Sequence, residues 1–508
     1  MLSSLGDLQG ARALQEQVLE VSSRTLPDDH PDLQRARTSL SVTLESLGDL
    51  RAARVLQEQV LEVRSRTLPT EHPDLQRARR RLAGTLYSLG DLQGARALQE
   101  EVVEICSRTL SDEHPDLQEA QATLAVTLYS LGDLQGARAL QEQVLEVRSR
   151  TLSDEHPDLQ GARGNLAVTL WRLADLQGAR ALQEKVLEVR SRTLPDEHFN
   201  LQRARGDLAV TLQSLGDLQG ARALQEAVLE ICSRTVSDVH PDLQGARENL
   251  AVTLYSLGDL QGARALQEKV LEVRSRTLPD VHPDLQGARA HLAATLYLLG
   301  DLQGARALQE KVLEVRSRTL PDEHFDLQGA RRNLAVTLHS LGDLQGALAL
   351  HEKVLEVHSR TLSAEHPDLS GARENLSAAL RSLGDLQGAR ALQELVIEVR
   401  SRTLPAEDPD LQGVLGQLAA TLYLLGDLQR ARALQEQVLE VRLRTLPAEH
   451  PQLEWARRDL ALTLIAEHTA RQAERERARK AGRRVGIDVS NWSPPAPPRS
   501  CTRCRNSS

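Results

Sequence analysis

The sequence is short of aromatic residues and of long apolar runs. Only 2% of its 508 residues are aromatic, so a folded core has to be built from Leu, Val and Ala. No apolar run approaches the roughly 18 residues that a membrane span needs. The start, MLSSLGDLQG, has neither the basic region nor the apolar region of a secretion signal. These absences predict a cytoplasmic protein with no membrane partner.

Cysteine is equally scarce and gives no disulfide framework. Cys106 and Cys232 occur singly, where most equivalent stretches of the sequence have Arg, and we expect both to stay reduced. Cys501 and Cys504 form a CTRC tail after a Pro-rich segment, which is half of a zinc-site pattern without its second half. Apart from these two thiols, no metal site is expected, and no cofactor.

Catalytic motifs are missing as well. The chain contains no Gly-Lys dipeptide, which excludes a phosphate loop of the P-loop type. No serine or cysteine nucleophile stands in a distinctive motif with a partnered base. The sequence therefore predicts a protein that is not an enzyme.

The net charge of −9 is unevenly distributed. Residues 466–508 carry ten Lys and Arg against four Asp and Glu, which leaves the rest of the chain at −15. An acidic body argues against a nucleic-acid partner.

What the sequence does contain is one unit written many times. The stretch AVTLYSLGDLQGARALQE occupies residues 125–142 and recurs unchanged at residues 251–268. A Gly-Asp pair recurs every 42 residues, with Ala174 in place of one Gly, and a loop histidine recurs at the same interval from His30 to His450, with Asp408 in place of one His. Eleven copies of one unit predict a stacked repeat array.

One unit shows how the repeat should fold. Pro241 and Asp242 favour a first helical turn, Gly258 suits the left-handed residue that ends a helix, and Asp259 is a cap for the next helix. Between the loop and Gly258, apolar residues follow helical spacing at Leu243, Ala246, Leu250, Leu254 and Leu257. Each unit is therefore expected to be a hairpin of two antiparallel helices, A and B. A lone hairpin cannot bury its apolar face, so the units must stack into an all-α, α-solenoid fold.

The unit NLAVTLYSLGDLQGARALQEKVL resembles the tetratricopeptide repeat, with Leu250, Ala251, Gly258 and Ala263 at signature positions. The 42-residue length and the His-Pro-Asp loop are most similar to the repeats of kinesin light chain. The resemblance implies a right-handed superhelix whose concave groove, lined by the A helices, holds peptides. Leu254 and Leu260 depart from it, since the family usually has an aromatic residue at these positions.

Two variable columns on helix A are candidates for the peptide-binding groove. The first, which we call the aromatic ladder, collects every tyrosine of the chain and comprises Tyr87, Tyr129, Trp171, Tyr255, Tyr297, His339 and Tyr423. Aromatic side chains are common interface anchors. The alternative is that these rings pack against the helix of the next repeat. Both interpretations stay open at this point.

In the second column, peptide-binding members of the family use Asn to hold a ligand backbone, which the resemblance carries over to Asn165, Asn249, Asn333 and Asn375. An amide can donate and accept hydrogen bonds at once. The alternative is a solvated polar position. The residue after the ladder is mostly Ser, with Arg172 as the exception, which argues against a site for a free C-terminal carboxylate.

The array is expected over residues 1–467, in about 11 repeats of which the first lacks most of helix A. A charged helical extension or cap over 468–484 and a disordered tail over 485–508 follow. Because the chain opens with helix B, Leu5, Leu8, Leu14 and Val18 are expected to lack a cover. Exposed apolar stripes of this kind predict a docking surface, for an upstream domain or another copy of the array.

The leading functional hypothesis is a non-enzymatic protein-protein interaction scaffold that binds peptide segments in the groove of a superhelix. One alternative is the sensor half of a larger signalling enzyme, a nucleotide-binding ATPase or a protease, truncated at Met1. Another is an architectural spacer. The expected partners are in every case proteins or peptides.

Overall fold

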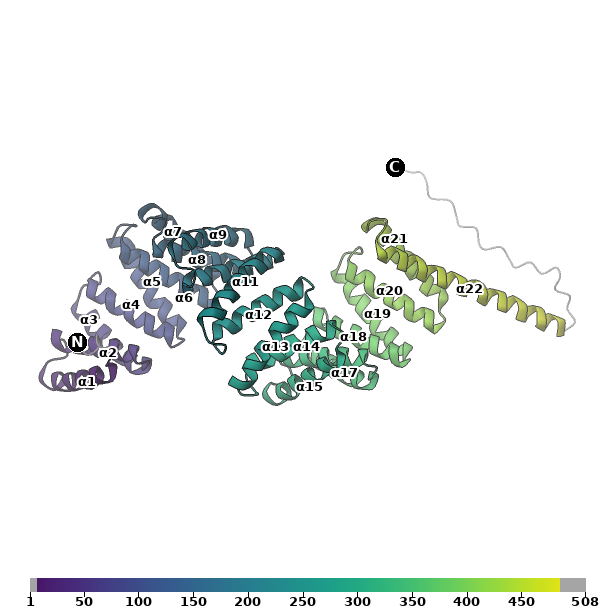
Figure 1. Cartoon of the computed structure of the whole chain (residues 1–508), viewed down its shortest axis with the longest axis horizontal. Helices are drawn as coiled ribbons and strands as arrows, with labels where there is room; N and C mark the ends of the chain where they lie inside the picture. Colours follow the sequence, from purple (N-terminus) through teal and green to yellow (C-terminus); the bar gives the residue numbers. More distant parts are fainter. Residues whose placement is uncertain (1–6, 485–508) are drawn as a thin grey trace. The chain divides into compact units, whose positions relative to one another are not determined.

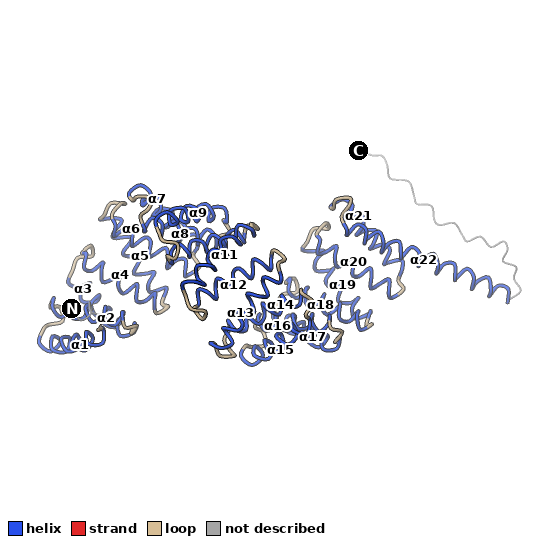
Figure 2. The backbone as a smooth tube through the Cα atoms, viewed as in Figure 1, coloured by secondary structure: helices blue, strands red, loops and turns tan. Residues whose placement is uncertain are grey.

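The structure is a computed structural model that describes residues 7–484. Over this range it consists of 22 α-helices without a strand, joined by short loops (Figure 1, Figure 2). The predictions for Met1, Leu5 and the 485–508 tail, with Cys501 and Cys504, lie outside the described residues. None of the helices within 7–484 is long and apolar enough to cross a membrane.

The chain forms two compact units, Met1–Leu266 and Gln267–Ser508, with the boundary inside α13 (Leu260–Thr277). The first unit contains α1 (Leu8–Thr25), α2 (Pro31–Ser46), α3 (Leu50–Thr67), α4 (Pro73–Ser88), α5 (Leu92–Thr109), α6 (Pro115–Leu131), α7 (Leu134–Thr151), α8 (Pro157–Arg172), α9 (Leu176–Thr193), α10 (Phe199–Ser214), α11 (Leu218–Thr235) and α12 (Pro241–Ser256). The second contains α14 (Pro283–Leu298), α15 (Leu302–Thr319), α16 (Phe325–Ser340), α17 (Leu344–Thr361), α18 (Pro367–Leu383), α19 (Leu386–Thr403), α20 (Pro409–Leu425), α21 (Leu428–Thr445) and α22 (Pro451–Arg484). Even numbers are A helices and odd numbers are B helices.

Each A helix begins at the loop histidine, as its position before Pro-Asp predicts. The His30 ring accepts a hydrogen bond at Nδ1 from the backbone N–H of Asp32. The same bond, 3.1–3.3 Å long, recurs at each loop histidine through His450. Asp408 makes the equivalent bond with its carboxylate, at 2.9 Å. Helix capping therefore explains the histidine column.

The Gly-Asp pair makes the turn inside each hairpin, also as predicted. The glycines adopt φ between 80° and 89°, in the left-handed region. The following aspartate caps helix B, since its Oδ1 accepts from a backbone N–H three residues on at 2.8–3.3 Å. Ala174 takes the same backbone conformation with φ 62° and is the one non-Gly residue with positive φ in the described range.

This alanine gives a first testable prediction. Because a Cβ atom is strained in the left-handed region, Ala174→Gly is expected to stabilise the hairpin of α8 and α9 by about 1 kcal/mol. The reverse change at an equivalent turn, Gly132→Ala, should destabilise its hairpin by a similar amount. Urea unfolding midpoints of the two variants and the parent chain measure both effects. A lower midpoint for Ala174→Gly would contradict the strain argument.

The core repeats with the sequence. In the cluster at α6 and α7, Leu124 and Leu128 are buried against Ala137, with Val103 of the preceding B helix packed beside them. Ala137 and its equivalents are fully buried, which lets helices A and B approach closely. Within each unit, a helix packs chiefly against the helices before and after it in the sequence. This is the predicted all-α solenoid.

The stripe predicted on α12 is buried as expected at Leu243, Ala246, Leu250 and Leu254, which are 2–7% exposed. Leu257 ends the helix and is half-buried. The last helix, α22, continues past the repeat to Arg484 because no Gly-Asp turn interrupts it. Within α22, the buried carboxylate of Glu467 forms ion pairs with Arg471 at 3.1 Å and with Arg432 of α21 at 3.6 Å.

Candidate interaction surface

The aromatic ladder lies near the C-terminal ends of the A helices, where the side chains are neither buried nor free. Trp171 and Tyr255 are each 37% exposed. The other members of the ladder are half-buried, namely Tyr87, Tyr129, Tyr297, His339 and Tyr423. Each of these side chains is therefore partly exposed to solvent.

Several members of the ladder bridge to the next A helix, on the residue 43 positions later. The bridges are Tyr87 OH to Ser130 Oγ at 3.0 Å, Trp171 Nε1 to Ser214 Oγ at 3.3 Å, Tyr297 OH to Ser340 Oγ at 3.0 Å, and His339 Nε2 to Ser382 Oγ at 2.9 Å. At Tyr129 the equivalent position is Arg172, whose guanidinium carbon lies 5.3 Å from the ring centroid. These five side chains thus contact the next repeat, and a role of the ladder in ligand binding stays a prediction.

The direction of these hydrogen bonds follows from the serines. Ser130 Oγ donates to the carbonyl oxygen of Val126 at 3.0 Å, so its proton is already used. Tyr87 must then donate to Ser130. The same holds for Tyr297, because Ser340 donates to Val336 O. A bridging tyrosine therefore keeps an acceptor lone pair on its hydroxyl oxygen.

The asparagine column lies on the same A helices but faces a different neighbour. Asn165, Asn249 and Asn333 are exposed, and Asn375 is half-buried. Asn165 of α8 borders a small pocket whose other walls include Ala122 of α6 and Gln141 of α7. Trp171 of the same helix instead reaches forward to α10. Asn165 and Trp171 of α8 thus face different neighbours, the preceding helices α6 and α7 and the following helix α10.

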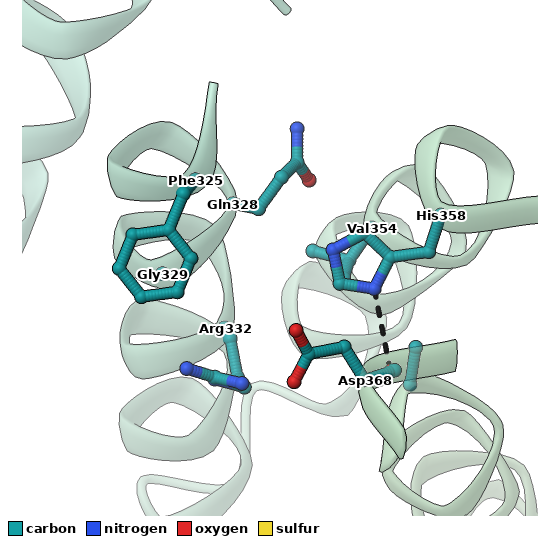
Figure 3. Close-up of a pocket in the computed structure, with 8 residues that line it drawn as sticks. Phe325, Gln328, Gly329, Arg332, Val354, His358 and Asp368 are labelled. Atoms are coloured by element: carbon teal, nitrogen blue, oxygen red, sulfur yellow. Dashed lines mark hydrogen bonds between the residues drawn. The ribbon is translucent and has the colours of Figure 1, made fainter. Parts of the chain in front are cut away.

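The pocket beside Asn165 recurs between other repeats. Each copy lies between one A helix, the following B helix and the next A helix, as at Phe325 of α16, His358 of α17 and Asp368 of α18 (Figure 3). A B-helix side chain crosses the gap to a backbone carbonyl oxygen of the next A helix: His358 Nδ1 lies 3.3 Å from Asp368 O, and Arg148 donates to Asp158 O at 2.9 Å. These copies enclose about 20 Å³, room for about one water molecule.

Sequence reasoning missed two columns of glutamine that line or support these pockets. Gln141 of α7 is 6% exposed and its Oε1 has no hydrogen-bond partner within the described residues. Gln160 of α8 is 3% exposed and its Nε2 donates to the loop carbonyl of Asp154. The available signal was spacing, since Gln141 follows Ala137 by four residues and precedes Val144 by three. In unit 2, His351 replaces the first of these glutamines, and burial, with the nearby His339, lowers its pKa to about 4.

The remaining candidates are structural. Cys106 and Cys232 are free and buried, and burial raises the pKa of both thiols, which disfavours the reactive thiolate. The recurring Arg-Glu pairs of the B helices are intrahelical, as at Arg138 and Glu142, 2.7 Å apart on the surface. In residues 7–484, no group of three His, Cys, Asp or Glu side chains could hold a metal ion.

Several solved structures match this chain. A Podosopora anserina chain assigned to kinesin light chain, with nearly identical TPR-like repeats, is 30% identical over 40% of this chain and 95% of its own, with a TM-score of 0.38. A STAND ATPase with a tetratricopeptide repeat sensor from Pyrococcus horikoshii is 11% identical over 73% and 53%, TM-score 0.52. The quorum sensor NprR from B. thuringiensis is 14% identical over 72% and 98%, TM-score 0.51.

Among curated protein sequences, none matches this chain. The sequence model of the tetratricopeptide repeat matches residues 1–66, 74–150, 116–192, 158–234 and 326–402, and a second model of the same repeat matches 244–284, 286–326 and 413–452. With matches over more than half of its length and the helix hairpins described above, this chain belongs to the tetratricopeptide repeat family.

Proposed function

We propose that this protein is a non-enzymatic scaffold that binds peptide segments of partner proteins along its A helices. The observation that carries the proposal is the aromatic ladder, in which four side chains bridge to the next repeat and all seven are partly exposed. The proposed contact residues are the ladder and the asparagine column: Tyr87, Tyr129, Trp171, Tyr255, Tyr297, His339, Tyr423, Asn165, Asn249, Asn333 and Asn375. The cytoplasmic location predicted from the sequence is part of this proposal.

Exposed aliphatic side chains next to the ladder support a binding role. Val126, Val252 and Val336 stand three residues before ladder positions and are 36–40% exposed. Leu298 and Leu424, at the position after the ladder, are 52% and 57% exposed. Aromatic edges and aliphatic side chains on one helix end are the composition of an interface core.

The direct test is selection of a phage-displayed library of random linear peptides on the immobilised chain. Replacing Tyr129, Tyr255 and Tyr297 by Ala should weaken capture of the enriched peptides more than tenfold, since an aromatic anchor contributes about 2 kcal/mol or more. The matched control changes the same three residues to Phe, which removes the three hydroxyls, among them the Tyr297–Ser340 bridge, but keeps the rings, and should retain most binding. Circular dichroism should show equal helicity for both variants.

Two results would overturn the scaffold proposal. One is a wild-type chain that enriches no peptide, which would leave the spacer hypothesis. The other is an alanine variant that captures the enriched peptides as tightly as the parent. The hypothesis of a sensor half of a signalling enzyme gains no separate support, because the likeness to the STAND sensor shows the fold alone.

The apolar face of α1 remains a second predicted contact surface. Leu14 and Val18 are 53% and 55% exposed, while Leu8 is half-buried. We keep docking of another domain or a second copy of the array at this face as part of the proposed function. Sedimentation of the parent chain and of a Leu14→Glu, Val18→Glu variant distinguishes self-association from its absence.

A further inference from the structure

One inter-repeat pocket differs from the others in size and charge. It lies between α2, α3 and α4 of the first unit and encloses about 180 Å³, against about 20 Å³ for its equivalents at α6–α8 and α8–α10. Three arginines line it, Arg64 of α3 and Arg77 and Arg81 of α4. One water molecule occupies about 30 Å³ in the liquid, so this cavity has room for a group larger than a water molecule.

The protein neutralises the three guanidinium groups only in part. Arg64 is half-buried and donates to the backbone carbonyl of Asp74 at 2.9 Å. Arg77 pairs with the Asp74 carboxylate at 2.8 Å. Within residues 7–484, no carboxylate lies within 4.0 Å of the Arg81 guanidinium. A second carboxylate, that of Glu45, accepts a hydrogen bond at 2.6 Å from Gln57, which also lines the cavity. Three cations and two carboxylates thus leave a local charge of +1.

Burial and the two neighbouring arginines both disfavour the charged form of Arg64. Burial lowers its pKa, and the charges of Arg77 and Arg81 lower it further, against the raising effect of Asp74. A cationic side chain under this strain is stabilised by any anion that enters the cavity.

In the equivalent pocket at α10, the fifth A helix, the protein itself supplies a carboxylate. In the pocket between α8, α9 and α10, Arg190 donates to Asn200 O at 2.9 Å, as Arg64 does to Asp74 O. Arg203 stands in the place of Arg77. Asp207 stands in the place of Arg81, and its carboxylate lies 3.8 Å from Arg203 Nε. The pocket between α2, α3 and α4 has arginines at the same two positions, a third arginine where the other pocket has a carboxylate, and a larger cavity.

We propose that the cavity between α2, α3 and α4 binds a phosphate group, in the position that Asp207 occupies in its own pocket, with Arg64, Arg77 and Arg81 as the ligating residues. A phosphate monoester carries about −1.5 to −2 charges at pH 7 and offers three acceptor oxygens to the three guanidinium groups, whereas a carboxylate carries one charge and offers two oxygens. Guanidinium groups bind phosphate oxygens through paired N–H donors. The phosphate belongs either to a phosphorylated residue of a partner or to free phosphate. This inference does not depend on the aromatic ladder.

The test uses the full chain and three small probes: inorganic phosphate, N-acetyl-phosphoserine amide and N-acetyl-glutamate amide. Titration calorimetry should detect binding of the two phosphate probes, and Arg81→Asp, which supplies the carboxylate internally, should weaken it at least tenfold. Arg81→Asn, with the residue that four other repeats carry, should weaken it less. The control is Arg35→Asp, because Arg35 is the exposed equivalent of Arg77 in the preceding repeat and pairs with Asp32 outside the cavity. It changes the net charge equally and should bind as the parent does.

Tighter binding of the phosphoserine amide than of inorganic phosphate would identify a phosphorylated partner, and equal binding would identify free phosphate. Both support the site. The proposal is overturned if the parent binds neither phosphate probe, if the glutamate amide binds as tightly, or if Arg35→Asp weakens binding as much as Arg81→Asp. None of these results bears on peptide capture by the ladder, so the two proposals fail separately.

Discussion

Replacing Leu422 by Ala is expected to lower the local free energy of unfolding of α20 and α21 by about 3 kcal/mol, the usual cost of a Leu→Ala cavity. Leu422 is fully buried and packs in a cluster with Leu418, Ala431 and Ile397. These neighbours lie on three successive helices, so no single side chain can move to fill the void. The loss should be largest in the two helices of this hairpin, because each repeat is stabilised by its own contacts and those of its neighbours.

The matched control is Leu424→Ala, two residues along the same helix. Leu424 is 57% exposed, so its truncation should change stability by about 0.5 kcal/mol or less. Amide hydrogen exchange in α20 and α21 measures the opening free energy of each variant. Equal protection of the two variants would mean that the cluster does not hold this hairpin together.

The second large effect is expected from acid at His351. Its side chain is 4% exposed, and its pKa of about 4 in the folded chain lies below the ordinary value of 6.5. Between these two values the unfolded chain binds a proton that the folded chain does not. The stability that the neutral ring provides is therefore complete above pH 6.5 and is lost as the pH falls towards 4, by about 3 kcal/mol at pH 4.

The control for His351 is provided by the other repeats, which carry Gln at this position. His351→Gln removes the titrating group and should remove this part of the acid sensitivity, while all carboxylates and the other histidines are unchanged. The measurement is the urea midpoint of both chains at pH 7 and pH 4.5. Parallel shifts in the two chains would show that His351 is not the responsible group, as would an NMR titration of its ring with a midpoint near 6.5.

The helices and their ends could be predicted from the sequence because their determinants are local. A cap such as His30 or Asp133 acts on a backbone N–H two or three residues away. The turn glycines depend only on their own φ angle. The leucine stripe of α12 follows from the helical period alone. Each of these features repeats every 42 residues, so one correct interpretation holds for the whole array.

The contacts between repeats could be predicted less well. That Tyr87 reaches Ser130 depends on the angle at which one hairpin packs on the next, which no spacing within a hairpin gives. Gln141 was missed because a polar side chain does not count toward an apolar stripe, although it is buried at a stripe position. The three arginines, which come from two successive repeats, were visible singly in the sequence, but their convergence on one cavity required the arrangement of α2, α3 and α4.

The packing of each helix on its sequence neighbours has a consequence for how such a gene can change. Removing or inserting a whole 42-residue unit joins surfaces that are already equivalent, such as the one around Ala137 and the one around Ala179, both fully buried. Recombination between the near-identical coding stretches can therefore lengthen or shorten the array without a new core having to be evolved. An insertion of any other length would place a helix where a loop belongs. Selection for folding thus permits changes in the number of repeats. Retention of a particular copy then depends on the residues that differ between copies.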